Sequence, residues 1–557
     1  MDYDLKIVGG TIVDGTGTPG RSGDVGIKDG RLVAVGDASG AATEVVDAGG
    51  RVVAPGFVDI HTHYDAQILW DRMLSISPWH GVTTVLMGNC GFGVAPARPE
   101  HHELLVRTLE NVEGMSAAAL QAGMGGWGFE TFPQYLDMID RRGSAINVAA
   151  LIGHTPVRLY VMGEEATERA AAEDEVAHMR AIVAEALGAG AAGFATSRAP
   201  THVGFGGRPV PSRAADIGEV FALAGALGEA GRGIMQATVG SDLFFAEFEE
   251  IAAETGRPIT WTALLAGMLG PGSHRSLLER AVQTQDKGLA VYPQVTCRPL
   301  MFEFQFSAPF ILESLPAFAP AVAAVDRAGK ERVYGDPAFR KGLREATSGR
   351  GAIGGDLWDR MTIAQCPQEP ALDERPLGQV AAERGVHPVD LALDLALASD
   401  LGARFRLAVA NYDEDEVEEL LGHPGTVLGL SDAGAHASQL CDACFSTFLL
   451  GHWARDRGAM PLEEAVRMLT SRPAEVMGLQ DRGRLAAGLA ADVVVLDPDT
   501  VAAGPLRRVE DLPAGADRLV ADAVGIDTVV VNGVVVRRDG GDVLDADGPL
   551  PGRVVRP

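Results

Sequence analysis

RVVAPGFVDIHTH, residues 51–63, is an apolar stretch that predicts a buried strand ending in two histidines. Alternate residues of a strand project to the same face, so His61 and His63 can bind one metal ion together, and Asp59 shares that face. In (β/α)8 barrels the catalytic groups lie at the carboxyl ends of the strands. The position of this pair therefore favours a metal site over an ordinary pair of surface histidines.

Residues 55–480 alternate between strand-like and helical patterns. Short apolar runs such as TTVLMGNCGF, INVAALIGH and RPITWTALLA are separated by helical stretches such as EDEVAHMRAIVAEALGAG at 173–190. This alternation predicts an α/β fold with a parallel sheet, closed as a (β/α)8 TIM barrel. A stretch near 290–350, rich in proline and aromatic residues, predicts an insertion. An open doubly wound sheet is the alternative, although no GxGxxG follows the first strand.

The two ends of the chain share a different pattern. Residues 1–54 and 481–557 contain β-branched runs broken by tight turns, among them Asp29-Gly30 and Asn532-Gly533. Such runs are typical of hairpins. We expect the two segments to build one small β-sandwich beside the barrel.

The composition limits the classes of partner. Hydrophobic residues make up 46% of the chain, and the net charge is −28 with a sequence pI of about 4.8. This charge repels phosphate backbones, so a nucleic-acid partner is not expected. No signal-like segment opens the chain, and no apolar run is long enough to span a bilayer. We therefore expect a cytoplasmic protein with a small-molecule substrate and no membrane partner, and a homo-oligomer stays open.

The cysteines do not predict a disulfide framework. There are five in 557 residues, an odd and sparse set. Cys441 and Cys444 form a CxxC pair, but no second pair completes a structural zinc site. Incidental packing is the favoured interpretation of that pair.

Three further strand ends carry reactive groups, each with an ordinary alternative. Cys90 lies in a glycine-rich turn, either as a thiolate metal ligand or as a buried inert thiol. His154 contacts either substrate or structural hydrogen-bond partners. Asp432, with His436 beyond it, either serves a metal and transfers protons or caps a helix.

Taken together, these motifs resemble the amidohydrolase superfamily, specifically its N-acyl-D-amino-acid deacylase (D-aminoacylase) branch. The matching stretches cover essentially the whole chain: GGTIVDGTG (9–17), APGFVDIHTHYD (54–65), GVTTVLMGNCGFGVAP (81–96), GLSDAGAH (429–436) and LTSRPAEVMGLQDRGRLAAGLAADVVVLD (469–497). The resemblance implies a metal-bearing barrel flanked by a β-sandwich from both termini. It also implies that His61, His63, Cys90 and Asp432 are metal ligands and that Asp432 is the general acid/base.

The chain departs from this branch at two places. Where D-aminoacylases have two further metal-binding histidines, the best-corresponding residues here are Gln236 and Thr262, whose oxygens are poor zinc ligands. His202 and His274 lie in neighbouring loops and are possible substitutes. We therefore expect one divalent ion, zinc by preference because a thiolate is a ligand.

The second departure concerns the substrate carboxylate. Deacylases of this branch have an arginine shortly after the catalytic aspartate, and the corresponding segment here has no near match. Arg198 and Arg298 are the candidates to replace that arginine, because a guanidinium binds a carboxylate through two hydrogen bonds.

The sequence thus predicts a metal-dependent amidohydrolase that cleaves a non-peptide C–N amide bond, with N-acyl-D-amino acids or related small amides as substrates. The ion would polarise the carbonyl and activate water, while Asp432 would accept the proton of water and pass it to the departing nitrogen. One alternative is a mononuclear hydrolase of cyclic amides or another specialised C–N bond. Another is a barrel that has lost its catalytic activity.

Overall fold

A computed structural model of the chain describes residues 1–313, 315–347 and 357–557. These residues form two compact units. The first comprises residues 1–264, 277–297 and 420–557, and the second comprises residues 265–276 and 298–419. Each is described by itself below.

Among the described residues of the first unit, one sheet has eight strands in the order β17-β12-β11-β10-β9-β8-β7-β6, and the neighbouring strands are parallel. Its strands are β6 (Phe57–Asp59), β7 (Val82–Met87), β8 (Asn147–Gly153), β9 (Gly193–Ser197), β10 (Ile234–Thr238), β11 (Ile259–Thr262), β12 (Val291–Val295) and β17 (Val427–Leu428). A parallel bridge between Thr62 and Ala433 joins the two ends of the sheet. The fold is the predicted (β/α)8 barrel.

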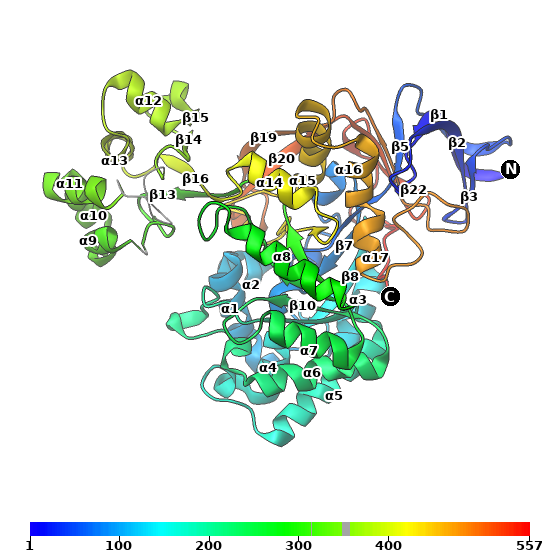
Figure 1. Ribbon diagram of the computed structural model, residues 1–557, viewed down its shortest axis with the longest axis horizontal. Helices are drawn as coiled ribbons and strands as arrows, with labels where there is room; N and C mark the ends of the chain where they lie inside the picture. The colour runs from blue at the N-terminus through cyan, green and yellow to red at the C-terminus, as the bar shows by residue number, and fades with distance from the viewer. Residues whose placement is uncertain (314, 348–356) are drawn as a thin grey trace. The chain divides into compact units, whose positions relative to one another are not determined.

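Helices cover the outside of this sheet, and Figure 1 shows α4 to α7 together on one side of it. The helices of this unit are α1 (His102–Glu113), α2 (Ala117–Gly123), α3 (Phe132–Arg142), α4 (His154–Met162), α5 (Glu173–Ala189), α6 (Ile217–Ala230), α7 (Phe245–Thr255), α8 (Ser273–Asp286, whose first turn belongs to the second unit), α15 (Phe445–Phe448), α16 (Leu462–Leu469) and α17 (Ser471–Val476). Helix α5 buries Met179, Val183 and Leu187 on one face, and it ends at Gly190, whose φ of 107° is left-handed.

Both ends of the chain contribute to a second sheet, which has nine strands in the described part of the chain. These are β1 (Tyr3–Ile12), β2 (Arg21–Lys28), β3 (Arg31–Gly36), β4 (Ala42–Asp47), β5 (Val52–Pro55), β18 (Val493–Leu496), β21 (Ile526–Val531), β22 (Val534–Arg538) and β23 (Gly541–Asp542). Strand β18 pairs with both β5 and β21, and its Val493 is buried in the same core as Leu5 and Val530. The two termini thus share one core.

A separate hairpin, β19 (Ala502–Val509) and β20 (Arg518–Val524), was not predicted. It contacts the loop that follows β17. The backbone N–H of Leu519 donates to the carbonyl of Ala437 at 2.7 Å, and Arg508 donates to the carbonyl of Ser438 at 2.9 Å. This hairpin therefore holds the loop that follows β17, at the carboxyl end of the barrel strands.

The second unit takes in most of the predicted insertion together with residues 265–276, and it extends well beyond the insertion, to Glu419. Residues 314 and 348–350 of that predicted insertion lie outside the described residues. The elements of this unit are β13 (Leu300–Gln305), α9 (Ala319–Ala323), α10 (Arg327–Gly335), α11 (Pro337–Ala346), β14 (Met361–Gln365), β15 (Arg375–Pro376), α12 (Leu377–Arg384), α13 (Pro388–Ala398), β16 (Arg404–Ala410) and α14 (Glu414–Leu421). Phe306, Tyr334 and Phe405 lie in its core. Of all the helices described, none is both long and apolar enough to cross a membrane.

Candidate metal centre

His61 and His63 follow β6 at the carboxyl end of the barrel, and both are almost completely buried. The Nδ1 atom of His61 donates to Oε1 of Gln294 at 2.6 Å, and Nδ1 of His63 lies 3.4 Å from Oε2 of Glu113. Partners of this kind fix the tautomer and orientation of metal-binding imidazoles. Each histidine is therefore left with Nε2 as its available ligand atom.

Cys90 lies in a turn between β7 and the next helix, with a left-handed φ of 56°. Its backbone N–H donates to Oε1 of Gln236 at 2.6 Å, and its Sγ atom lies 3.5 Å from Nε2 of His61. Gly91, with a φ of 74°, has no room for a side chain, because a Cβ there would lie 2.7 Å from Cα of Thr196. The glycines thus allow the turn to pack on the neighbouring strands and present the thiol.

Asp432 follows β17 and completes the cluster. Its Oδ1 atom lies 3.3 Å from Nε2 of His61 and 3.8 Å from Nε2 of His63. Asp432 itself has a left-handed φ of 46°, and in the described chain the next helix begins at Phe445. Helix capping, the alternative role for this residue, has no helix to act on here.

The four side chains fit a metal ion. The ligand atoms of His61, His63 and Cys90 all lie within 4.8 Å of one another. Bond lengths of about 2.0–2.3 Å place the ligand atoms of tetrahedral zinc roughly 3.3–3.8 Å apart. The distances between Sγ or Oδ1 and the imidazole nitrogens, 3.3 to 3.8 Å, match that spacing.

The charge of the cluster also favours a cation. Burial raises the pKa of Cys90, Glu113 and Asp432, and mutual repulsion adds to this for Cys90 and Glu113. Burial lowers the pKa of His61 to about 4, so the imidazole is neutral. Among the described ion pairs of these acidic groups, none involves lysine or arginine. A divalent ion would supply the missing positive charge.

Glu113 was not identified from the sequence. It is the last residue of α1, is 3% exposed, and its backbone carbonyl also accepts from the N–H of His436 at 2.6 Å. Its helix has an ordinary amphipathic pattern, so no local signal distinguishes it from a surface glutamate.

The two residues that stand at the predicted histidine positions also lie at this cluster. Gln236 is engaged by the Cys90 backbone, and Thr262, together with Thr238, makes a side-chain hydrogen bond with the Cys90 thiol. His202 packs edge-on against Phe92, two residues after Cys90. His274 belongs to the second unit, where its ring nitrogens lie 3.6 Å from Glu416 and 3.1 Å from Glu419.

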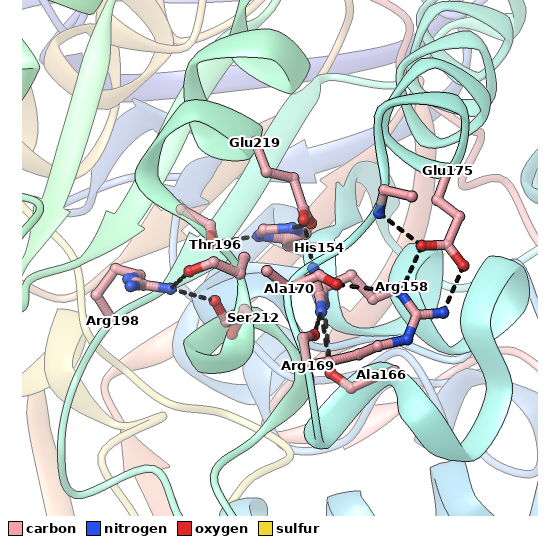
Figure 2. Close-up of polar contacts among 12 residues, drawn as sticks. His154, Arg158, Ala166, Arg169, Ala170, Glu175, Thr196, Arg198, Ser212 and Glu219 are labelled. Carbon is pink, nitrogen blue, oxygen red and sulfur yellow. Dashed lines mark hydrogen bonds and ion pairs between the residues drawn. The ribbon is translucent and has the colours of Figure 1, made fainter.

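His154 begins α4 and is completely buried. Figure 2 shows it between Thr196 and Glu219, which hydrogen-bond to Nδ1 at 2.8 Å and to Nε2 at 2.7 Å. Arg158 donates to the other carboxylate oxygen of Glu219. Both ring nitrogens of His154 are engaged in hydrogen bonds with protein side chains, which agrees with a structural role. A contact with substrate stays a prediction.

The two predicted arginines are placed differently from each other. Arg198 follows β9, and its guanidinium donates to Asp242 and to the carbonyls of Ser212 and Ala215; Figure 2 shows the side chains of Arg198 and Ser212. Binding a substrate carboxylate would require that pair with Asp242 to open. Arg298 is buried in the second unit. For both residues substrate binding stays a prediction.

A family model described as the amidohydrolase family matches residues 44–537. The D-aminoacylase of Alcaligenes xylosoxydans xylosoxydans is 33% identical over 551 residues, which are 96% of this chain and 94% of that protein.

The chain belongs to the amidohydrolase family.

It is accordingly a metal-dependent hydrolase that acts on C–N bonds other than peptide bonds. Two solved structures agree with this assignment. One is an N-acyl-D-glutamate deacylase from Bordetella bronchiseptica with zinc and a phosphonate mimic of the tetrahedral intermediate; its TM-score is 0.66 at 29% identity, covering 100% of both chains. The other is a D-aminoacylase described by a binuclear metal centre with one-metal activation and second-metal attenuation; its TM-score is 0.66 at 27% identity, covering 99% of both chains.

Proposed function

We propose that the chain hydrolyses the amide bond of N-acyl-D-amino acids with one divalent ion, zinc by preference, held by His61, His63, Cys90 and Asp432. Similarity to a D-aminoacylase and to an N-acyl-D-glutamate deacylase supports this substrate class. Cytoplasmic residence and a homo-oligomer stay predictions.

The observation that carries this proposal is the convergence of Nε2 of His61, Nε2 of His63, Sγ of Cys90 and Oδ1 of Asp432 at distances suited to one ion. An ion bound there supplies Lewis acidity to the substrate carbonyl and to the attacking water. Thiolate and imidazole ligands favour zinc over the harder magnesium and calcium ions.

Asp432 is suited to move the proton. Its Oδ1 atom lies against the two imidazoles, so Oδ2 is the oxygen left to accept a proton from water. Burial raises the pKa of this carboxyl, which makes its ionised form a stronger base. The same oxygen then delivers the proton to the departing nitrogen.

Gln236 and Thr262 support a single ion. The carbonyl oxygen of Gln236 accepts from Cys90, and the Thr262 hydroxyl donates to Thr238 at 3.3 Å. Neither oxygen competes well with imidazole for zinc. The test is the metal content of the double variant Gln236→His/Thr262→His. We expect about one equivalent in the wild type and a second in the variant, and two equivalents in the wild type would refute the single-ion proposal.

The substrate is tested with chelator-free protein on N-acetyl-D-amino acids, their L-enantiomers and cyclic amides. We expect turnover of the D-compounds, and a fall of about 10²–10⁴-fold or more in Asp432→Ala, because that variant lacks the general base. The matched control is Asp174→Ala on exposed α5. Exclusive turnover of cyclic amides, or an Asp432→Ala variant with full activity, would overturn the proposal.

A further inference from the structure

His202 lies five residues beyond Ser197, the last residue of β9, at the catalytic end of the barrel. Its Nδ1 atom is 2.6 Å from Oγ of Ser197, which also accepts from the backbone N–H of Ala199 at 3.3 Å. Arg213 donates to the carbonyl of His202 at 3.0 Å and holds the backbone of this loop. The imidazole is therefore held through Nδ1, and the backbone of His202 is held by Arg213.

The contact with Ser197 bears on the tautomer of His202. Either group can be the donor; when the Ser197 hydroxyl donates its one hydrogen, Nδ1 of His202 is the acceptor and the ring hydrogen lies on Nε2. Nε2 has no hydrogen-bond partner in the described part of the chain. In this tautomer Nε2 is an available N–H donor on a ring held through Nδ1.

The ring of His202 lies beside the turn that carries Cys90. The ring packs edge-on against Phe92, two residues after Cys90, with 5.3 Å between the ring centroids. Burial, and secondarily His436, lowers the pKa of His202 to about 4, so the ring stays neutral at ordinary pH. His61 adds a small contribution to the lowering of the pKa of His202.

We propose that His202 is a catalytic residue whose Nε2–H donates a hydrogen bond to the carbonyl oxygen of the scissile amide, an inference that rests on the proposed function. As water oxygen bonds to the carbonyl carbon, the carbonyl π electrons move to that oxygen, and the donor stabilises the new negative charge. When the electrons return, the C–N bond breaks and the amine takes the proton held by Asp432. His202 itself gains and loses no proton.

A neutral donor suits this task. It stabilises charge that develops in the transition state without transferring its hydrogen, as an oxyanion-hole donor does. Removal of one such donor costs about 10²–10³-fold in kcat. A metal ligand would behave differently, because its removal releases the ion.

The test compares His202→Ala and His202→Gln with the wild type, with exposed His178→Ala as the matched control. Gln places an N–H near the position of Nε2. We expect His202→Ala to lower kcat by about 10²–10³-fold with little change in KM. Its zinc content should equal that of the wild type, and its affinity for a phosphonate mimic of the intermediate should fall in parallel. His202→Gln should recover part of each loss.

Two outcomes overturn the inference. Loss of zinc in His202→Ala would make His202 a ligand, and unchanged kcat in an active enzyme would leave it no catalytic role. Wild-type protein that turns over none of the N-acyl-D-amino acids would instead overturn the proposed function, and this inference with it.

Discussion

Replacing Glu113 by Gln tests whether the buried carboxylate behind His63 strengthens metal binding. The amide oxygen can still face Nδ1 of His63, which lies 3.4 Å from the native carboxylate, but the negative charge is removed. Partners of this kind contribute about 10–100-fold to metal affinity, or about 1.4–2.8 kcal/mol. We expect the zinc dissociation constant of Glu113→Gln to rise within that range.

Without metal, the same substitution should not destabilise the protein and should stabilise it at higher pH. Burial and the neighbouring Asp432 raise the pKa of Glu113 well above its usual value. A carboxyl whose pKa is raised by folding loses stability as pH rises above its unfolded value, because the folded state binds the extra proton. Glu113→Gln removes this penalty, so its metal-free form should melt no lower than the wild type, and relatively higher as pH rises.

Zinc affinity is measured by competition with a chromophoric chelator, and melting temperature by scanning with and without zinc. The matched control is Glu110→Gln on the same helix, where Glu110 pairs with Arg107 at the surface. A variant that loses melting temperature without metal but keeps native zinc affinity would refute the reasoning, because Glu113 would then be a packing residue only.

Three other changes follow from the same geometry. Arg158→Met leaves Glu219 buried without its arginine, so the free energy of unfolding, measured by urea titration, should fall by about 3–5 kcal/mol. The double variant Arg158→Met/Glu219→Gln should recover part of that loss. An unchanged midpoint of urea unfolding in Arg158→Met would contradict this. Gly91→Ala forces a Cβ to within 2.7 Å of Cα of Thr196, which should displace the turn that presents the Cys90 thiol. The thiolate-to-metal absorption of the cobalt-substituted protein should therefore weaken. An unaltered spectrum would contradict the role of this turn in positioning Cys90. Zinc affinity should rise with pH, because burial raises the pKa of Cys90 and the thiol must lose its proton to bind; competition titrations across about pH 5–9 check this, and a flat profile would argue against thiolate ligation.

The sequence contained the parts of the site that depend on local pattern. The strand ending in His61 and His63 and the glycine-rich turn around Cys90 follow from periodicity and turn chemistry within a few residues. The structure brings these residues together with Asp432. That meeting follows from the barrel, since the ends of its first, second and last strands are neighbours at one face.

The supporting contacts could not be read from local pattern. Gln294 reaches His61 across 233 residues of sequence, and Gln236 reaches Cys90 across 146. Glu113 ends a helix that follows β7, and the hydrophobic periodicity of that helix does not predict where the helix lies relative to the barrel strands. Arg198 presents the same difficulty, because its partner Asp242 is 44 residues away in the sequence. The residues around an arginine do not show whether its guanidinium is free or already paired with a carboxylate.

The surroundings of Cys90 bear most directly on the number of ions. A buried thiolate needs positive charge or hydrogen-bond donors, and a second metal ion is one way to meet that need. Here the Thr262 hydroxyl donates to Thr238 at 3.3 Å, and the Thr238 hydroxyl is left to donate to the Cys90 side chain, which partly offsets the burial that raises the pKa of Cys90. The Oε1 atom of Gln236 already accepts from the Cys90 backbone N–H at 2.6 Å, so ligation of a second ion by this oxygen would compete with that hydrogen bond. The proposal of a single ion therefore rests on these neutral groups, which supply hydrogen bonds around Cys90 where a second ion would supply charge.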